Sequence, residues 1–259
     1  MKTLVALGLA ALMAAPLPAA AQSALTDVLS GGVLKVGTTG DWNPMSVRDP
    51  ATNSYKGYDI DVTAELAKDL GVEVQYVATD WKTLVNGVVA GQYHMTGSAS
   101  ISPARMKAAG FSESYLTVVI LPFTTEAKAD RFSDWDDVNQ PGVTVATTLG
   151  TTFEAFVREW FPEATIRVVE APARGYQEVL AGRADVFVTS NVEGATLIEK
   201  FPNLSRIEVS TPRAPSPIAM LLPQTDQVWI NYVNNWIKVK QLEGFFDRTA
   251  EKWGLASGS

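Results

Sequence analysis

Short apolar segments alternate with amphipathic helical segments along this chain, and the alternation occurs twice. In the first block, VLKVGTTG (33–40) and VEVQYVA (72–78) predict strands, and GYDIDVTAELAKDLG (57–71) between them predicts a helix. In the second block, VTVATTLG (143–150) and ADVFVTS (184–190) predict strands, with further helical segments around them. Strands that alternate with helices are typical of parallel βαβ units, so the sequence predicts an α/β fold.

Two breaks in this pattern separate the blocks. A polar or irregular stretch near 122–130 follows the first block, and a proline-rich stretch near 211–217 follows the second. The apolar segment IAMLLP (218–223) then predicts one more strand before a helical C-terminal segment. The chain of 259 residues is long enough for one large domain or for two lobes of ~100 residues each.

The helix expected over 57–71 has acidic residues in its first turn and ends at a glycine. Four of its apolar residues fall close to one face, and we expect this face to point to the core: Ile60, Ala64, Ala67 and Leu70.

The N-terminal 21 residues have the pattern of a secretory signal peptide. Lys2 supplies a positive charge, LVALGLAALMAAPLPAA is apolar, and Ala19–Ala21 fits the small-residue cleavage rule before Gln22. A membrane anchor is the alternative, but the run is short for a span of ~20 apolar residues, and Pro16 and Pro18 interrupt it. We therefore expect cleavage after residue 21, export to the periplasm and no membrane insertion of the mature chain.

Composition excludes several kinds of site. The chain has no cysteine, so disulfides, thiolate metal sites and cysteine nucleophiles are excluded. His94 is the single histidine, and no zinc or Ser/His/Asp motif surrounds it, so we expect an ordinary strand residue and no metal or cofactor. The formal net charge of −7 argues against nucleic acid or an anionic membrane as a partner.

Five segments occur in the order typical of one known family: VGTTGDWNPMS, YKGYDIDVTAELAKDLG, SASISPARMKAAGFSESY, LGTTFEAF and LAGRADVFVTS. Together they resemble the family 3 periplasmic solute-binding proteins, which are mostly amino-acid receptors of ABC transporters. The resemblance implies the two-lobed type II periplasmic binding protein fold, with two crossover strands and a ligand cleft between the lobes. The first lobe is expected to comprise 25–121 plus 218–259 and the second 122–217, with an inner-membrane ABC permease as partner.

The same resemblance implies a binding site for a small carboxylate-bearing ligand. Ser98, Ser100 and Arg105 match the motif that grips a carboxylate in the family, and a guanidinium can give a planar anion two parallel charge-assisted bonds. Trp42 and Trp81 match cleft positions at which aromatic rings sandwich the body of the ligand. Since each follows an expected strand, they fit the rule that ligands of open α/β sheets bind beyond the carboxyl ends of strands.

Thr151 and Thr152 match the contribution of the second lobe to the ligand site. They begin an expected helix, so their backbone N–H groups would point toward a bound anion. Simple N-capping is the alternative role, and both can hold at once.

One position departs from the pattern of the amino-acid receptors. They usually carry an aspartate, which neutralises the ligand's ammonium group, where this chain has Ser190. A buried ammonium without a counter-charge is unfavourable. Either the ligand lacks an α-ammonium group, or another acid neutralises that group. Glu193 and Asp41 are the candidates for such an acid.

A second resemblance concerns cyclohexadienyl and arogenate dehydratases, which are enzymes on the same scaffold. GTTGDW, Trp81 after a Thr-Asp pair and the acid Glu193 are similar to their pattern, which implies Glu193 as a catalytic general acid. The chain departs from that pattern at TTLGTT, at Ser190 and at Pro217–Ile218. We interpret the sequence as a non-enzymatic receptor, with the dehydratase as the alternative and a signalling partner as a third class that uses this fold.

Overall fold

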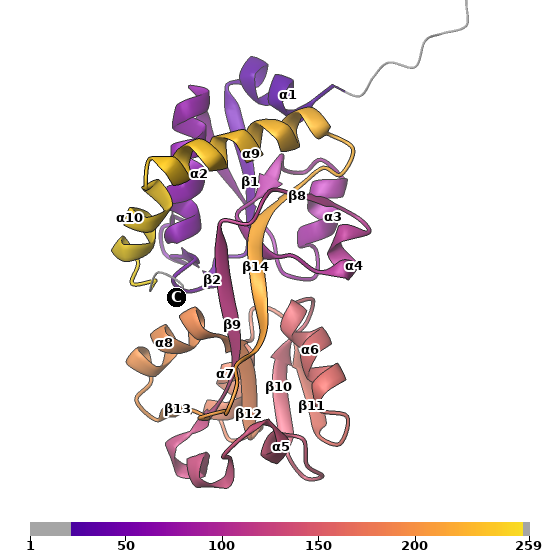
Figure 1. Ribbon diagram of the computed structural model, residues 1–259, viewed down its shortest axis with the longest axis vertical. Coiled ribbons are helices and arrows are strands. Elements are labelled where there is room, and N and C mark those ends of the chain that lie inside the picture. The colour runs from indigo at the N-terminus through magenta and orange to yellow at the C-terminus, as the bar shows by residue number, and fades with distance from the viewer. Residues whose placement is uncertain (1–21, 256–259) are drawn as a thin grey trace, which may run out of the picture.

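Two α/β lobes are stacked along the long axis of the molecule in the computed structural model, and two long strands join them (Figure 1). The structure describes residues 22–255, so the expected signal peptide lies outside the described residues. Within that range no helix is long and apolar enough to cross a membrane.

The first lobe is built on a three-stranded parallel sheet with the order β5-β1-β6. A small antiparallel sheet, β2-β3-β4, lies beside it. The strands of this lobe are β1 Val33–Thr38, β2 Asp41–Trp42, β3 Ser46–Arg48, β4 Tyr55–Lys56, β5 Glu73–Ala78, β6 Met95–Thr96, β7 Ser98–Ser100 and β8 Gly110–Phe111. Its helices are α1 Ala24–Gly31, α2 Tyr58–Leu70, α3 Leu84–Val89, α4 Pro103–Met106, α9 Gln227–Leu242 and α10 Phe245–Lys252.

The second lobe has β10 between β11 and β12, all parallel, with β12 antiparallel to β9. Helices α5 and α6 share one apolar core with the sheet, and α7 and α8 share another. Its elements are a 3-10 helix Glu126–Arg131, α5 Trp135–Val138, β10 Thr144–Thr148, α6 Thr152–Trp160, β11 Thr165–Val169, α7 Gly175–Leu180, β12 Val186–Ser190, α8 Asn191–Lys200 and β13 Leu204–Arg206.

The two crossover strands are β9 (Leu116–Thr125) and β14 (Arg213–Leu222), which pair antiparallel along the middle of the molecule (Figure 1). The two breaks expected from the sequence are therefore wrong in part, because residues 122–125 and 213–217 belong to these strands. Prolines fit here because the register shifts between Arg213 and Ser216, and the carbonyl of Pro217 accepts a hydrogen bond from Ile101. The proposed lobe boundaries, 121/122 and 217/218, fall inside these strands and stay a proposal.

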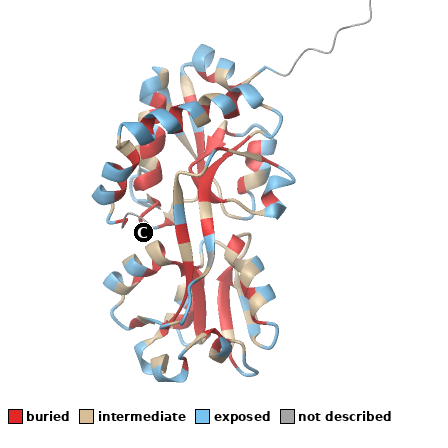
Figure 2. Cartoon of the chain, viewed as in Figure 1, coloured by how far each residue is buried: buried red, intermediate tan, exposed pale blue. Residues whose placement is uncertain are grey.

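Buried residues are concentrated on the strands of both lobes and on the helix faces against them (Figure 2). On α2 the expected core face is wrong in part: Ala67 is buried and Leu70 packs against the core, but Ala64 is exposed and Ile60 is only half-buried. The core face is centred on Tyr58, Val62 and Leu66, which follow one another at a spacing of four residues.

The lobes approach each other closely at Gly150, which follows β10. Its φ is +78°, and a Cβ placed on it would lie 2.6 Å from the Cα of Lys82 in the first lobe. Lys82 also forms an exposed ion pair with Glu170 across the cleft, at 2.8 Å. The cleft is therefore closed in this structure.

We predict that Gly150→Ala opens the two lobes, because the added methyl group meets backbone atoms of the facing lobe. Small-angle X-ray scattering should give a larger radius of gyration than for the wild type. Gly142→Ala is the matched control, since Gly142 also has a positive φ of +88° but has open space around its Cβ position. Equal radii for the two variants would contradict the tight approach.

Candidate functional site

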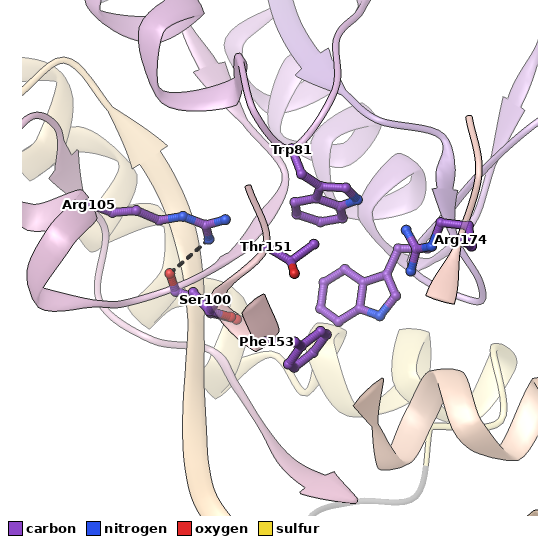
Figure 3. Close-up of a pocket in the computed structure, with 8 residues that line it drawn as sticks. Trp81, Ser100, Arg105, Thr151, Phe153 and Arg174 are labelled. Carbon is purple, nitrogen blue, oxygen red and sulfur yellow. Dashed lines mark hydrogen bonds between the residues drawn. The ribbon is translucent and has the colours of Figure 1, made fainter. Parts of the chain in front are cut away.

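Three adjoining compartments lie in the closed cleft. The first, of about 300 Å³, is called the aromatic compartment and is lined by Trp42, Trp81, Ser100, Arg105, Thr151, Thr152, Phe153 and Arg174 (Figure 3). The second, of about 280 Å³, shares Thr151, Phe153 and Arg174 with it and includes Glu193. The third, of about 240 Å³, lies behind Trp42 and Trp81 in the first lobe and includes Asp59 and Ser98.

Arg105 lies on α4, directly after the loop that follows β7, and only 8% of it is exposed. Its guanidinium donates to the carbonyl of Ser100 at 3.1 Å and, across the cleft, to the carbonyl of Gly150 at 3.4 Å. In the described range it forms no ion pair with a carboxylate, and burial lowers its pKa to about 10. Arg105 is thus a buried cation with only neutral partners.

The second lobe contributes the N-terminal end of α6. Thr151 is the N-cap: its hydroxyl accepts from the backbone N–H of Glu154 at 3.3 Å and donates to the carbonyl of Thr148 at 2.7 Å. Thr151 and Thr152 both line the aromatic compartment. The capping alternative therefore holds, and the expected contact with an anion stays a prediction.

Trp42 and Trp81 pack against each other and do not form two parallel walls. Their ring centroids are 5.8 Å apart with an interplanar angle of 76°. Trp42 is also 4% exposed and belongs to the core of the first lobe. Both rings line the aromatic compartment, but in the closed cleft no ligand fits between their faces as the sandwich expectation required.

Arg174 is the site residue that the sequence analysis missed. It is 7% exposed and precedes α7, after the carboxyl end of β11. Its guanidinium donates to Asp41 Oδ2 of the first lobe at 2.8 Å and to Glu193 Oε1 of the second at 2.7 Å. Its position beyond the end of a parallel strand was the available signal, because ligand sites of open α/β sheets gather there.

Glu193 is fully buried on the first turn of α8. Burial raises its pKa, while the charge of Arg174 and the hydroxyl of Thr189, which donates to Oε2, act in the opposite direction. Glu193 lines the second compartment together with Thr147, whose buried hydroxyl has no hydrogen-bond partner among the described residues. Glu193 thus lies beside the aromatic compartment and not on its wall.

Ser190 is the N-cap of α8, and its hydroxyl accepts from the backbone N–H of Glu193 at 3.3 Å. The indole N–H of Trp42 also donates to it across the cleft at 3.4 Å. Ser190 therefore contacts both lobes and carries no charge.

Ser98 lies in the third compartment, apart from Arg105. Its hydroxyl donates to Asp59 Oδ1 and is 2.9 Å from the hydroxyl of Tyr115. Asp59 is fully buried, and burial raises its pKa to about 7 against the lowering effect of the hydrogen bonds from Ser98. In this structure Ser98 holds Asp59 and does not line the aromatic compartment, in contrast to the sequence-based expectation.

His94 precedes β6, and its Nδ1 accepts a hydrogen bond from the backbone N–H of Lys35 at 3.0 Å. Across residues 22–255 no group of three or more His, Asp or Glu side chains is arranged to hold a metal ion.

A closed cleft between two α/β lobes that are joined by two crossover strands defines a solute-binding fold. Residues 34–256 match the bacterial extracellular solute-binding proteins, family 3, and the chain belongs to this family. The fold class expected from the sequence is thereby confirmed.

Both resemblances noted in the sequence are also found among characterised proteins. Cyclohexadienyl dehydratase of Pseudomonas aeruginosa is 31% identical over 249 residues, which cover 96% of this chain and 92% of that enzyme. The L-cystine-binding protein TcyA of Bacillus subtilis is 25% identical over 223 residues, which cover 86% of this chain and 81% of the relative. The crystal structure of the ancestral amino acid-binding protein AncCDT-1, a precursor of cyclohexadienyl dehydratase, has a TM-score of 0.82 at 34% identity and covers 89% of this chain and 99% of its own.

The buried carboxyl of Asp59 leads to a prediction about pH and stability. Its pKa of about 7 lies above the ordinary value of 3.8, so between these pH values the folded chain binds a proton that the unfolded chain does not. Ionisation of Asp59 therefore lowers the free energy of unfolding as pH rises from ~4 through ~7, by up to about 4 kcal/mol at 1.36 kcal/mol per pH unit. Asp59→Asn mimics the protonated acid, so this variant should not lose stability through ionisation at this position.

Melting temperatures across this pH range measure the effect. The melting temperature of Asp59→Asn should rise relative to the wild type as pH increases. Glu73→Gln, which alters an exposed acid of the same lobe, should keep a constant difference. A pH-independent difference for Asp59→Asn would contradict a neutral Asp59.

Proposed function

We propose that this chain is a periplasmic receptor that binds a small carboxylate-bearing solute and delivers it to an ABC permease in the inner membrane. The carrying observation is Arg105, a guanidinium that is 8% exposed and has only carbonyl oxygens as partners. Burying a cation without a counter-charge is unfavourable. A ligand carboxylate in the aromatic compartment supplies that counter-charge.

The surroundings of Arg105 support this proposal. A carboxylate can accept two parallel charge-assisted hydrogen bonds from one guanidinium, which fixes its plane. The N-terminal end of α6 faces the same compartment through Thr151 and Thr152, and a helix N-terminus favours an anion. Since Arg105 belongs to the first lobe and α6 to the second, an anion held by both favours the closed cleft.

The family supports the transport role. The relatives of this chain include an L-cystine-binding protein of Bacillus subtilis. We infer that the receptor opens by bending of β9 and β14 to admit and release the solute and that a bound solute stabilises the closed cleft, as in hinge-type binding proteins. The closed form is the one that a permease would recognise.

We predict that Arg105→Ala weakens binding of the cognate solute by ~2–5 kcal/mol, or about thirtyfold to several thousandfold in Kd. The solute is first found in a thermal-shift screen of amino acids, oxo acids and aromatic carboxylates, and calorimetry then gives Kd. Arg105→Lys should also bind weakly, because a point charge lacks the planar fork of the guanidinium.

Arg206→Ala serves as the control for this measurement, since Arg206 is exposed and pairs with Glu208 outside the cleft. Unchanged affinity in Arg105→Ala would place the carboxylate elsewhere and remove the main support for the proposal.

A dehydratase is the second candidate, and two observations favour it. Cyclohexadienyl dehydratase of Pseudomonas aeruginosa is 31% identical to this chain, and burial raises the pKa of Glu193 toward the range of a general acid. Against it, Arg174 donates a hydrogen bond to Glu193, and the aromatic compartment is lined by Arg174 and not by that acid. A general acid must reach the leaving hydroxyl directly or through one water.

We expect no conversion of prephenate or arogenate by the wild type, even at high protein concentration and long incubation. The assay measures phenylpyruvate and phenylalanine, with Glu193→Gln as the matched variant. General acid catalysis is worth ~10²–10⁴-fold, so a true dehydratase would lose its product almost completely in this variant. Product that depends on Glu193 would make the chain an enzyme and replace the receptor proposal.

A further inference from the structure

The cluster formed by Asp41, Arg174 and Glu193 lies beside the proposed carboxylate site at Arg105 and does not belong to that site. Arg174 bridges the cleft, because Asp41 belongs to the first lobe and Glu193 to the second. The side chains of Arg174 and Glu193 are 9% and 4% exposed, whereas that of Asp41 is 24% exposed. Although burial disfavours charge on Arg174, the carboxylates of Glu193 and Asp41 raise its pKa.

All four carboxylate oxygens of this cluster already accept a hydrogen bond from the protein. Asp41 Oδ1 accepts from the indole N–H of Trp81 at 3.0 Å, and Oδ2 accepts from Arg174. Glu193 Oε1 accepts from Arg174, and Oε2 accepts from the hydroxyl of Thr189. Arg174 is already the counter-charge of both acids, so an ammonium group that approached either of them would lie against the guanidinium cation.

The aromatic compartment itself has two cations and no acid on its wall. Arg105 and Arg174 lie at opposite sides of it, with Trp81 and Thr151 between them (Figure 3). Ser190, which stands where amino-acid receptors usually have an aspartate, is neutral and caps α8. Asp59, another acid of the cleft compartments, lies in the third compartment with Ser98.

We propose that Arg174 is a built-in cation that fills the cation subsite of the cleft, so that the ligand is a carboxylic acid without an amino group, such as a 2-oxo or 2-hydroxy acid. The carboxylate half of this statement rests on the proposed function. The role of Arg174 does not, because it follows from the contacts of Asp41 and Glu193 alone. Arg174 is thus a specificity-determining residue that excludes an ammonium group by charge and by occupancy.

Arg174→Ala tests the cation subsite without any carboxylate ligand. Removing the guanidinium leaves two acids around a space of its size, so methylguanidinium chloride should stabilise this variant in a saturable way at roughly millimolar concentration. The same concentration of sodium chloride should not, and neither the wild type nor Arg206→Ala should respond to methylguanidinium. A folded Arg174→Ala that is not selectively stabilised would overturn the assignment.

The two carboxylates left unpaired in Arg174→Ala can also prevent this variant from folding. A second variant tests the proposal in that case. Arg174→Ala/Glu193→Gln keeps only Asp41 as a charge, so like-charge repulsion is removed. It should fold and still bind methylguanidinium, more weakly than Arg174→Ala does. Absence of methylguanidinium binding in this folded variant counts against the proposal, and recovery of folded Arg174→Ala only with methylguanidinium present supports it.

Matched pairs of probes test the ligand class. Calorimetry compares a set of amino acids with the corresponding 2-oxo acids, including phenylalanine and phenylpyruvate, because Trp42, Trp81 and Phe153 line the compartment. The wild type should prefer the oxo acid of a pair by tenfold or more, and Arg174→Ala should reduce or reverse this preference. A wild type that binds the amino acid as tightly as its oxo acid contradicts the proposal.

The methylguanidinium experiment tests the role of Arg174, and the calorimetry tests the carboxylate receptor, so the two hypotheses can fail separately. If methylguanidinium rescues Arg174→Ala but no carboxylic acid binds the wild type, the cation subsite stands and the carboxylate receptor fails. If an oxo acid binds the wild type through Arg105 but methylguanidinium has no effect on the Arg174 variants, the receptor stands and the role of Arg174 fails.

Discussion

The closed cleft buries two guanidinium groups, and only one of them has carboxylates to pair with. Arg174 is neutralised by Asp41 and Glu193, whereas Arg105 has only the carbonyls of Ser100 and Gly150. A buried charge is tolerated when it is paired and hydrogen-bonded, so the unpaired cation is the part of the cleft that a ligand completes. The ligand class and the exclusion of an amino group that we propose both depend on this asymmetry of charge.

The fold explains why these charges meet. Parallel strands in each lobe direct their carboxyl ends toward the cleft, so Asp41 and Trp42 follow β1, Trp81 follows β5, Thr151 follows β10 and Arg174 follows β11. The two lobes touch through Gly150 and Lys82 and are joined by β9 and β14, so closure brings the groups from the two sides together. Glu193 is buried at this junction and hydrogen-bonded to Arg174, in a chain that is 31% identical to cyclohexadienyl dehydratase of Pseudomonas aeruginosa.

Local patterns predicted the α/β class and most strands and helices, and the family resemblance pointed to Arg105, which lines the aromatic compartment. Sequence patterns failed where the conformation or burial of a residue depends on partners that are distant in the sequence. The proline-rich segment before Ile218 is a strand because β9 pairs with it, and the burial of Val62 and Leu66 depends on which face of α2 meets the sheet of the first lobe. Ser98 was expected at the ligand because it matches the carboxylate-binding motif of the family, but its hydroxyl is hydrogen-bonded to Asp59. Arg174 has no motif of its own, and its role is visible only when Asp41 and Glu193, 133 and 19 residues away, are brought to it.

Native mass spectrometry of the protein, equilibrated with an equimolar mixture of amino acids and their 2-oxo and 2-hydroxy acids, tests the central claim most directly. The mass of the retained molecule distinguishes an amino group from a keto or hydroxyl group, and all candidates compete for the same cleft. The predicted result is retention of an oxo or hydroxy acid, with loss of that complex in Arg105→Ala. Retention of amino acids alone would contradict the claim that the cleft provides its own cation and requires from its ligand only an anion.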